Sequence, residues 1–128
     1  MSGNYLLDTN IIIALWKPDQ NIVTRLTGTN VTLSCIAAGE LLFGAFRSRQ
    51  VDSNVKRIEE FVLANRVLRC DSYTAFHYGR IKSDLLAKGR PIPENDIWIA
   101  AHALQYDLIL VSRDHHFNEI DGLNIEIW

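Results

Sequence analysis

Short runs of apolar residues alternate along the chain with longer segments in which apolar residues recur at three- and four-residue steps. The short runs have the length of buried strands, and the longer segments have the spacing of a helix face that packs on a core. Five runs are expected to be strands: residues 5–7, 31–33, 67–68, 108–111 and 125–127. Strands that alternate with helices predict an α/β fold in which a parallel sheet is covered by helices on both faces.

Two helices are marked by apolar residues on one face, with Val55, Ile58 and Val62 in the first and Ala75, Tyr78, Ile81 and Leu85 in the second. Asp71 and Ser72 precede the second helix and are suited to cap its first turn. Ser34 has the same position before a helix that includes residues 36–44. These polar residues therefore predict where the helices begin.

The chain has 128 residues, which is the size of one domain, and we expect that domain to span residues 1–128. With 48% hydrophobic and 22% charged residues, the composition excludes disordered and fibrous proteins. No stretch reaches the roughly 20 apolar residues of a membrane span, and residues 1–4 lack the basic region of a secretory signal. We therefore expect a cytoplasmic protein without a membrane partner.

Cys35 and Cys70 lack the spacing of metal ligands and lie in apolar surroundings in the sequence. A free thiol in such surroundings is usually buried and acts as a small apolar side chain. We expect both to be buried free thiols in a reducing cytoplasm.

Two acidic residues directly follow expected strands. Asp8 comes after residues 5–7, where a helix begins, and Asp114 comes shortly after residues 108–111. Ligands of parallel sheets bind beyond the carboxyl ends of the strands, so both side chains are placed where chemistry is expected. Two structural roles remain open: Asp8 can cap the helix, and Asp114 can be an ordinary loop residue.

Glu40 lies on an apolar helix face, because Ile36 and Gly44 are four residues away and Phe43 is three residues away. A carboxylate on such a face is costly unless it is paired or bound to a cation. Arg47 falls on the same side of the helix and can either pair with Glu40 or face a phosphate.

Asp96 follows Pro91, Pro93 and Glu94, a pattern that marks the start of a helix. The helix dipole favours acids in the first turn, which fully explains Glu94. Asp96 is different, because the small residue Ala100 follows it on the same face and lets the helix approach the sheet closely. We expect Asp96 to lie over the edge of the sheet.

Acids gathered at one end of a sheet repel one another, and their pKa values rise unless a cation joins them. Oxygen ligands favour Mg²⁺ or Mn²⁺ over zinc, and Mg²⁺ keeps water molecules that a phosphate can displace. The chemistry that follows is phosphodiester hydrolysis. The chain has a net charge of −2, from 13 basic and 15 acidic residues, and without the four acids it carries +2. Net charge therefore neither supports nor excludes a nucleic-acid partner.

At these residues the chain resembles the PIN-domain ribonucleases, and more narrowly the VapC-type toxins of bacterial toxin–antitoxin pairs. The resemblance covers essentially the whole chain. Its motifs are LDTN at 7–10, GEL at 39–41, FGA at 43–45, PIPEND at 91–96, IAA at 99–101 and LVSRD at 110–114, with Phe117 after them. All four acidic positions of the family are matched in order, and Ser112 stands where the family usually has Thr.

The resemblance implies a single three-layer PIN-like domain, with a central parallel sheet of about five strands flanked by helices. It also implies an endoribonuclease that depends on Mg²⁺ or Mn²⁺, a homodimer, and a cognate antitoxin that covers the acidic groove. By the same resemblance, Asp8 and Asp96 bind the metal directly, and Glu40 and Asp114 complete the catalytic site. Further residues would orient these carboxylates: Thr9, Asn10 and Ser112.

Other polar and aromatic residues have weaker functional interpretations. His115 and His116 are expected on a surface loop, since a metal-activated water needs no protein base, and His77 and His102 are expected to be structural. Four arginines can hold the RNA backbone or simply face solvent: Arg47, Arg49, Arg90 and Arg113. Three tryptophans are expected to pack rather than to stack on bases: Trp16, Trp98 and Trp128.

Three alternatives stay open. One is a PIN nuclease that processes RNA for housekeeping. A second is a binding module of the receiver type, which the single acid in Leu7-Asp8-Thr9 and the absence of a Lys at Ser112-Arg113 make a poor fit. A third is a PIN fold without catalysis, against which the complete acidic set argues.

Overall fold

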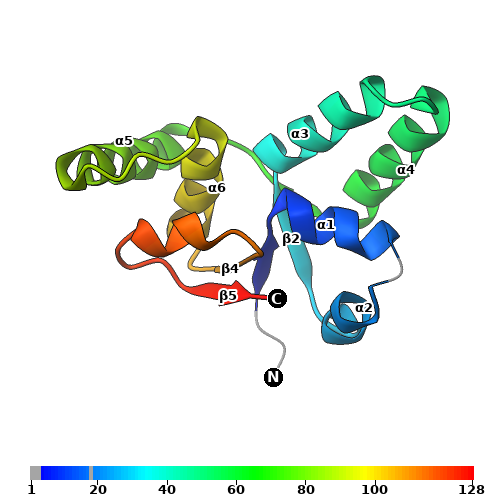
Figure 1. Cartoon of the computed structure of the whole chain (residues 1–128), viewed down its shortest axis with the longest axis horizontal. Coiled ribbons are helices and arrows are strands. Elements are labelled where there is room, and N and C mark those ends of the chain that lie inside the picture. The colour runs from blue at the N-terminus through cyan, green and yellow to red at the C-terminus, as the bar shows by residue number, and fades with distance from the viewer. Residues whose placement is uncertain (1–3, 18) are drawn as a thin grey trace.

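The computed structural model describes residues 4–17 and 19–128 (Figure 1). Residues 1–3, on which the expectation about a secretory signal partly rests, lie outside the described residues. The elements in chain order are β1 (Tyr5–Leu7), α1 (Thr9–Trp16), α2 (Gln20–Leu26), β2 (Val31–Ser34), α3 (Cys35–Phe46), α4 (Val51–Ala64), β3 (Arg66–Leu68), α5 (Ser72–Lys88), α6 (Glu94–Gln105), β4 (Ile109–Ser112), the 3-10 helix η1 (His115–Glu119) and β5 (Ile125–Ile127).

The five strands form one parallel sheet in the order β3-β2-β1-β4-β5, as the alternation of strands and helices predicts. In the central strand β1, Leu6 is in register with Thr32 of β2 and with Leu110 of β4. The strand bounds differ from the predicted ones by at most one residue. Leu108, for example, lies before β4 because its amide donates to the Ala103 carbonyl at the end of α6, at 2.9 Å.

Helices cover both faces of the sheet because successive strand residues point to opposite sides. Leu6 and Leu110 belong to the core beneath α5 and α6, whereas Leu7 and Val111 belong to the core beneath α1, α2 and α4. In Figure 1, α5 and α6 lie to the left of the sheet, and α1, α2 and α4 lie to its right. The predicted three-layer arrangement is therefore confirmed.

The predicted caps are largely confirmed. Asp71 accepts hydrogen bonds from the amides of Tyr73 and Thr74 and forms a capping box at the start of α5, while Ser72 is the first residue of that helix. The Ser34 hydroxyl accepts from the amide of Ile36 at 3.0 Å and caps α3. Both helices thus begin where local hydrogen bonding predicts.

Two predictions of burial are wrong. Cys35 is only half-buried and Cys70 is exposed, because they lie beyond the carboxyl ends of β2 and of the edge strand β3. Ala75 of α5 is exposed as well, since the buried face of that helix turns toward Thr74, Ile81 and Leu85 instead.

The tryptophans pack against other aromatic side chains, as expected. Trp98 stacks on Tyr78 with ring centroids 4.0 Å apart, while the other two make edge contacts, Trp16 with Phe61 and Trp128 with Tyr5. Within the described residues, no helix is both long enough and apolar enough to cross a membrane.

Candidate active site

Asp8 follows β1 and is the N-cap of α1. It therefore has both positions considered from the sequence, beyond the end of a strand and at the cap of a helix. Its Oδ1 accepts from the amide of Thr9 at 2.8 Å, and its own amide donates to the Val111 carbonyl at 2.9 Å. Its Oδ2 accepts from the Ser112 hydroxyl at 2.7 Å. With 6% of its surface exposed, Asp8 is a buried carboxylate held by neighbouring strands.

Glu40 lies half-buried in the middle of α3. The Thr9 hydroxyl donates to its Oε1 at 2.7 Å, and the Asn95 amide donates to its Oε2 at 3.4 Å. Arg47, by contrast, is exposed at the C-cap of α3, and no ion pair joins it to Glu40 among the described side chains. Glu40 is therefore oriented by neutral donors from two other elements.

Asp96 and Asp114 are joined by His116, which contradicts the expectation of a surface-loop histidine. Nε2 of His116 lies 2.6 Å from Asp96 Oδ2, and Nδ1 lies 2.9 Å from Asp114 Oδ1. The ring is half-buried because η1 begins directly after Asp114 and turns His116 back over the site, whereas its neighbour His115 is exposed.

The Ser112 hydroxyl connects three of the predicted residues. It donates to Asp8 and accepts from the amide of Asp114 at 3.0 Å and from the side-chain amide of Asn10 at 3.5 Å. The Asn10 side chain in turn accepts from the amide of Arg113 at 3.4 Å. Thr9, Asn10 and Ser112 thus each contact an acid or the segment that carries one.

These side chains line one cleft of about 530 Å³ above the carboxyl ends of β1 and β4. Its lining is Asp8, Thr9, Asn10, Ile13, Glu40, Pro93, Glu94, Asn95, Asp96 and Asp114. The structure therefore brings together all four predicted acids, although they come from the end of β1, from α3, from α6 and from the loop after β4.

Burial, together with the charges of neighbouring acids, raises the pKa values of Asp8 and Asp96. Burial raises the pKa of Asp8, and the nearby charges of Glu40 and Asp114 raise it further, against the lowering effect of its hydrogen bonds. The pKa of Asp96 is raised to about 6, first by burial and then by the charge of Asp8, although the hydrogen bond from His116 acts in the opposite direction. The ionised form of both carboxyl groups is therefore less favourable here than in water.

The donors in the cleft suit a hard divalent cation. Ligand atoms of Asp96, Asp114 and His116 lie within 4.8 Å of one another, and Asp8 and Glu40 add further carboxylate oxygens to the same cleft. Such a set, in which oxygen predominates, fits Mg²⁺ or Mn²⁺. A cation would also offset the burial and the mutual repulsion that raise the pKa values of Asp8 and Asp96.

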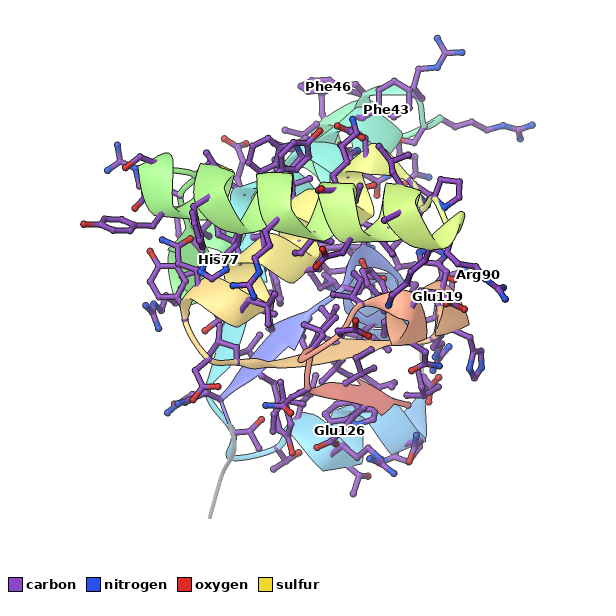
Figure 2. The ribbon with its side chains drawn as sticks, turned by 90° about the vertical axis from the view of Figure 1, so that its left-hand side faces the viewer. Phe43, Phe46, His77, Arg90, Glu119 and Glu126 are labelled. Atoms are coloured by element: carbon purple, nitrogen blue, oxygen red, sulfur yellow. The ribbon has the colours of Figure 1, made fainter. Side chains whose placement is uncertain are left out.

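Two of the four arginines are engaged elsewhere. Arg113 pairs with Asp19 and donates from Nε to the Trp128 carbonyl at 3.2 Å, and its hydrogen bond lowers the pKa of Asp19. Arg90 follows α5 and lies 3.9 Å from Glu119. The two side chains are labelled next to each other in Figure 2. Arg47 and Arg49 are exposed near the end of α3.

The remaining predicted residues lie away from the acids. His77 lines a separate hollow of about 380 Å³ between α5 and the segment after η1, on the face seen in Figure 2. His102 is fully buried in α6 and hydrogen-bonded on both ring nitrogens. The two hydrogen bonds of buried His102 support its structural role, whereas the role of His77 stays a prediction.

His116 and Asn95 are the site residues that sequence reasoning missed. Asn95 is adjacent to Asp96 in the first turn of α6, which offered a positional signal. His116 had only its closeness to Asp114 in the sequence, and that spacing does not reveal which way a 3-10 turn directs the ring.

The PIN domain family matches residues 5–123 of the chain. Among relatives in sequence, "Ribonuclease VapC1" of Haemophilus influenzae (strain R2866) is 35% identical over 130 residues, with 97% of each chain covered. The "tRNA(fMet)-specific endonuclease VapC" of Shigella flexneri is 35% identical over 128 residues, again with 97% of each chain covered. Among solved structures, the DNA-bound VapBC of Salmonella typhimurium superimposes with a TM-score of 0.90 at 32% identity, covering 100% of this chain and 99% of the other.

Proposed function

Because the chain belongs to the PIN-domain family, and within it to the VapC ribonucleases, we propose that it cleaves RNA in the cleft lined by Asp8, Glu40, Asp96 and Asp114. The sequence relatives that match 97% of the chain are ribonucleases, and the similar solved structures are VapBC toxin–antitoxin complexes. The protein is accordingly an endoribonuclease that acts as the toxin of such a pair.

Convergence of the four acids supports this assignment of the catalytic site. They come from four separate segments, line one cleft, and include two carboxyl groups whose pKa values are raised. A bound divalent cation would supply positive charge to the phosphate and make a water molecule more acidic. Asp8 and Asp96 are the proposed direct ligands, and Glu40 and Asp114 complete the set.

Neighbouring side chains hold these acids in place. Ser112 orients Asp8, Thr9 and Asn95 orient Glu40, and Asn10 supports the segment that leads to Asp114. His116 keeps Asp96 and Asp114 close together. Because their hydrogen bonds restrict the carboxylate rotamers, less conformational freedom is lost when a cation binds.

The surface beside the cleft suits the antitoxin. Phe43 and Phe46 of α3 are 70% and 62% exposed and stand together at one edge of the molecule in Figure 2. Phe43 also lines a hollow of about 610 Å³ that continues to Glu40. We propose that an apolar segment of the antitoxin covers this surface and so blocks the way to the acids.

The homodimer, the cytoplasmic location and the domain limits 1–128 stay predictions.

The catalytic assignment is tested with Asp8→Ala and Asp96→Ala in protein freed of its antitoxin. Both variants should lose cleavage of total RNA and of a tRNA(fMet) transcript, the RNA named for the Shigella flexneri relative. Asp84→Ala, which removes an exposed acid of α5, is the matched control and should cleave normally. If either active-site variant cleaves at the wild-type rate while its circular dichroism is native, the assignment is wrong.

The ion is tested by chelation. Cleavage should stop in EDTA and return with Mg²⁺ or Mn²⁺, while Ca²⁺ should restore little because it tolerates loose geometry and activates water poorly. Full activity after exhaustive chelation would indicate a metal-independent ribonuclease and would make His116 a candidate base.

A further inference from the structure

The two cysteines of the chain meet at the β3 edge of the sheet. Cys35 is the first residue of α3, and Cys70 follows β3 by two residues. Their Sγ atoms are 3.7 Å apart, which is van der Waals contact. The strands before them are neighbours, with Ser34 in register with Leu68, so the parallel ladder brings the two thiols to the same end of the sheet.

A buried histidine contacts the two residues that precede the cysteines, through the side chain of Ser34 and the backbone carbonyl of Arg69. Nδ1 of His102 lies 2.9 Å from the Ser34 hydroxyl, and Nε2 lies 3.1 Å from the Arg69 carbonyl. A carbonyl only accepts, so Nε2 carries the proton and Nδ1 accepts from Ser34. Burial lowers the pKa of His102, in agreement with a neutral ring.

One rigid side chain therefore binds the residue that precedes each cysteine. Ser34 is adjacent to Cys35, Arg69 is adjacent to Cys70, and His102 is completely buried between them. This bridge distinguishes the pair from two surface side chains that approach by chance, because the residue before each cysteine is hydrogen-bonded to the same buried ring.

We propose that Cys35 and Cys70 are a redox-sensitive thiol pair that a peroxide converts into an intrachain disulfide. One thiolate attacks a peroxide oxygen and breaks the O–O bond, which yields a sulfenic acid and hydroxide. The second thiol then attacks the sulfenic sulfur, forms the S–S bond and releases water. In total, two thiols and one hydrogen peroxide give one disulfide and two water molecules.

Oxidation of the pair is expected to be slow at neutral pH. Burial and the hydrogen bond with Cys35 raise the pKa of Cys70 to about 11, so this thiol is protonated at neutral pH and its own attack on a peroxide is slow. Cys70 is nevertheless exposed, and Cys35 is half-buried at the rim of a hollow that it shares with Glu40. A small peroxide can therefore reach the pair.

The disulfide would tie the first turn of α3 to the segment between β3 and α5. Glu40 lies in the same helix, five residues after Cys35, so oxidation would restrain an element of the acidic cleft. Closing the loop from residue 35 to residue 70 also limits the unfolded chain, and the oxidised protein should be more resistant to heat.

The experiment treats the purified full chain with hydrogen peroxide. Intact mass should fall by two hydrogen atoms, and a non-reducing peptide map should contain one cross-linked peptide that joins Cys35 to Cys70. The Tm should rise by about 5–10 °C and return to its starting value after dithiothreitol. Cys35→Ser and Cys70→Ser are the matched controls, and each should lack both the cross-link and the reversible rise in Tm.

Other oxidation products would overturn the proposal. These are independent addition of oxygen atoms to each sulfur, disulfides between separate chains, and an unchanged wild-type mass at a peroxide concentration that oxidises a free-cysteine peptide. The wild-type peptide map decides the question even if a serine variant fails to fold. None of these readouts depends on RNA cleavage, so the result stands apart from the proposed catalytic site.

Discussion

Replacing Asp96 by Asn removes one negative charge from the acidic cleft and keeps the shape of the side chain. We expect Asp96→Asn to be inactive yet more stable than the wild type when no metal is bound. The reason is that ionised Asp96 is destabilising in the folded protein, where burial and the charge of Asp8 act against it.

The size of the effect follows from the pKa. The pKa of Asp96 is raised from 3.8 to about 6, and its side chain is 15% exposed, so screening by solvent is limited. A difference of this size corresponds to about 3 kcal/mol of stability lost on ionisation. The variant also weakens the hydrogen bond with His116, at a cost of about 1 kcal/mol, and loses a charge favoured by the helix dipole, at about 0.5 kcal/mol. A net gain of about 1.5 kcal/mol remains, or roughly 6 °C in Tm.

The gain should depend on pH in one direction. Below about pH 4 Asp96 is protonated in the folded and the unfolded protein, so this carboxyl carries no penalty. As the pH rises from about 4 to about 6, the unfolded chain loses this proton first, and the wild type loses stability. The difference in stability between variant and wild type should therefore appear between about pH 4 and about pH 6 and stay constant above that range.

Thermal melts at pH 4.5 and 7.5 in EDTA measure the difference, with Asp84→Asn as an exposed-acid control that should show none. Repeating the melts in excess Mg²⁺ should raise the Tm of the wild type more than that of the variant, because only the wild type keeps the full ligand set. A variant clearly less stable than the wild type at pH 7.5 in EDTA would show that Asp96 mainly supports the start of α6. Equal Mg²⁺ shifts would place the metal outside this cleft.

Three further substitutions test individual hydrogen bonds of the fold and the site. Ser112→Ala removes the hydroxyl that donates to buried Asp8 and should lower the free energy of unfolding in urea by about 1–3 kcal/mol. Ser112→Thr should keep most of this stability. An unchanged urea midpoint in Ser112→Ala would show that the hydroxyl does not stabilise Asp8. His102→Leu leaves a hydroxyl and a carbonyl without their partner and should cost about 2–4 kcal/mol with RNA cleavage unchanged; a loss of cleavage in folded protein would argue against a purely structural histidine. His116→Ala releases Asp96 and should raise the Mg²⁺ concentration for half-maximal cleavage about tenfold, with the rate recovered at saturating Mg²⁺; a rate that excess Mg²⁺ does not recover would mean that His116 does more than position the acid.

Much of the fold follows from local patterns in the sequence. Apolar runs predict all five strands to within a residue, and Ser34 and Asp71 mark the starts of two helices, because these features depend on neighbours two to four residues apart. The acids follow the same logic, since Asp8 and Asp114 come directly after strands whose carboxyl ends meet at one edge of a parallel sheet.

Contacts between distant segments were decided by the tertiary structure. From the sequence, His116 was expected on a surface loop, but the 3-10 helix η1 positions it between the carboxylates of Asp96 and Asp114. Arg113 was a candidate for RNA binding, but it pairs with Asp19 at the start of α2. The cysteines were expected to be buried and are instead adjacent at a sheet edge. A side chain on a loop can adopt several rotamers, and its partner depends on how distant helices and strands pack together. The positions of acids at strand ends, by contrast, are set by the backbone of the sheet itself.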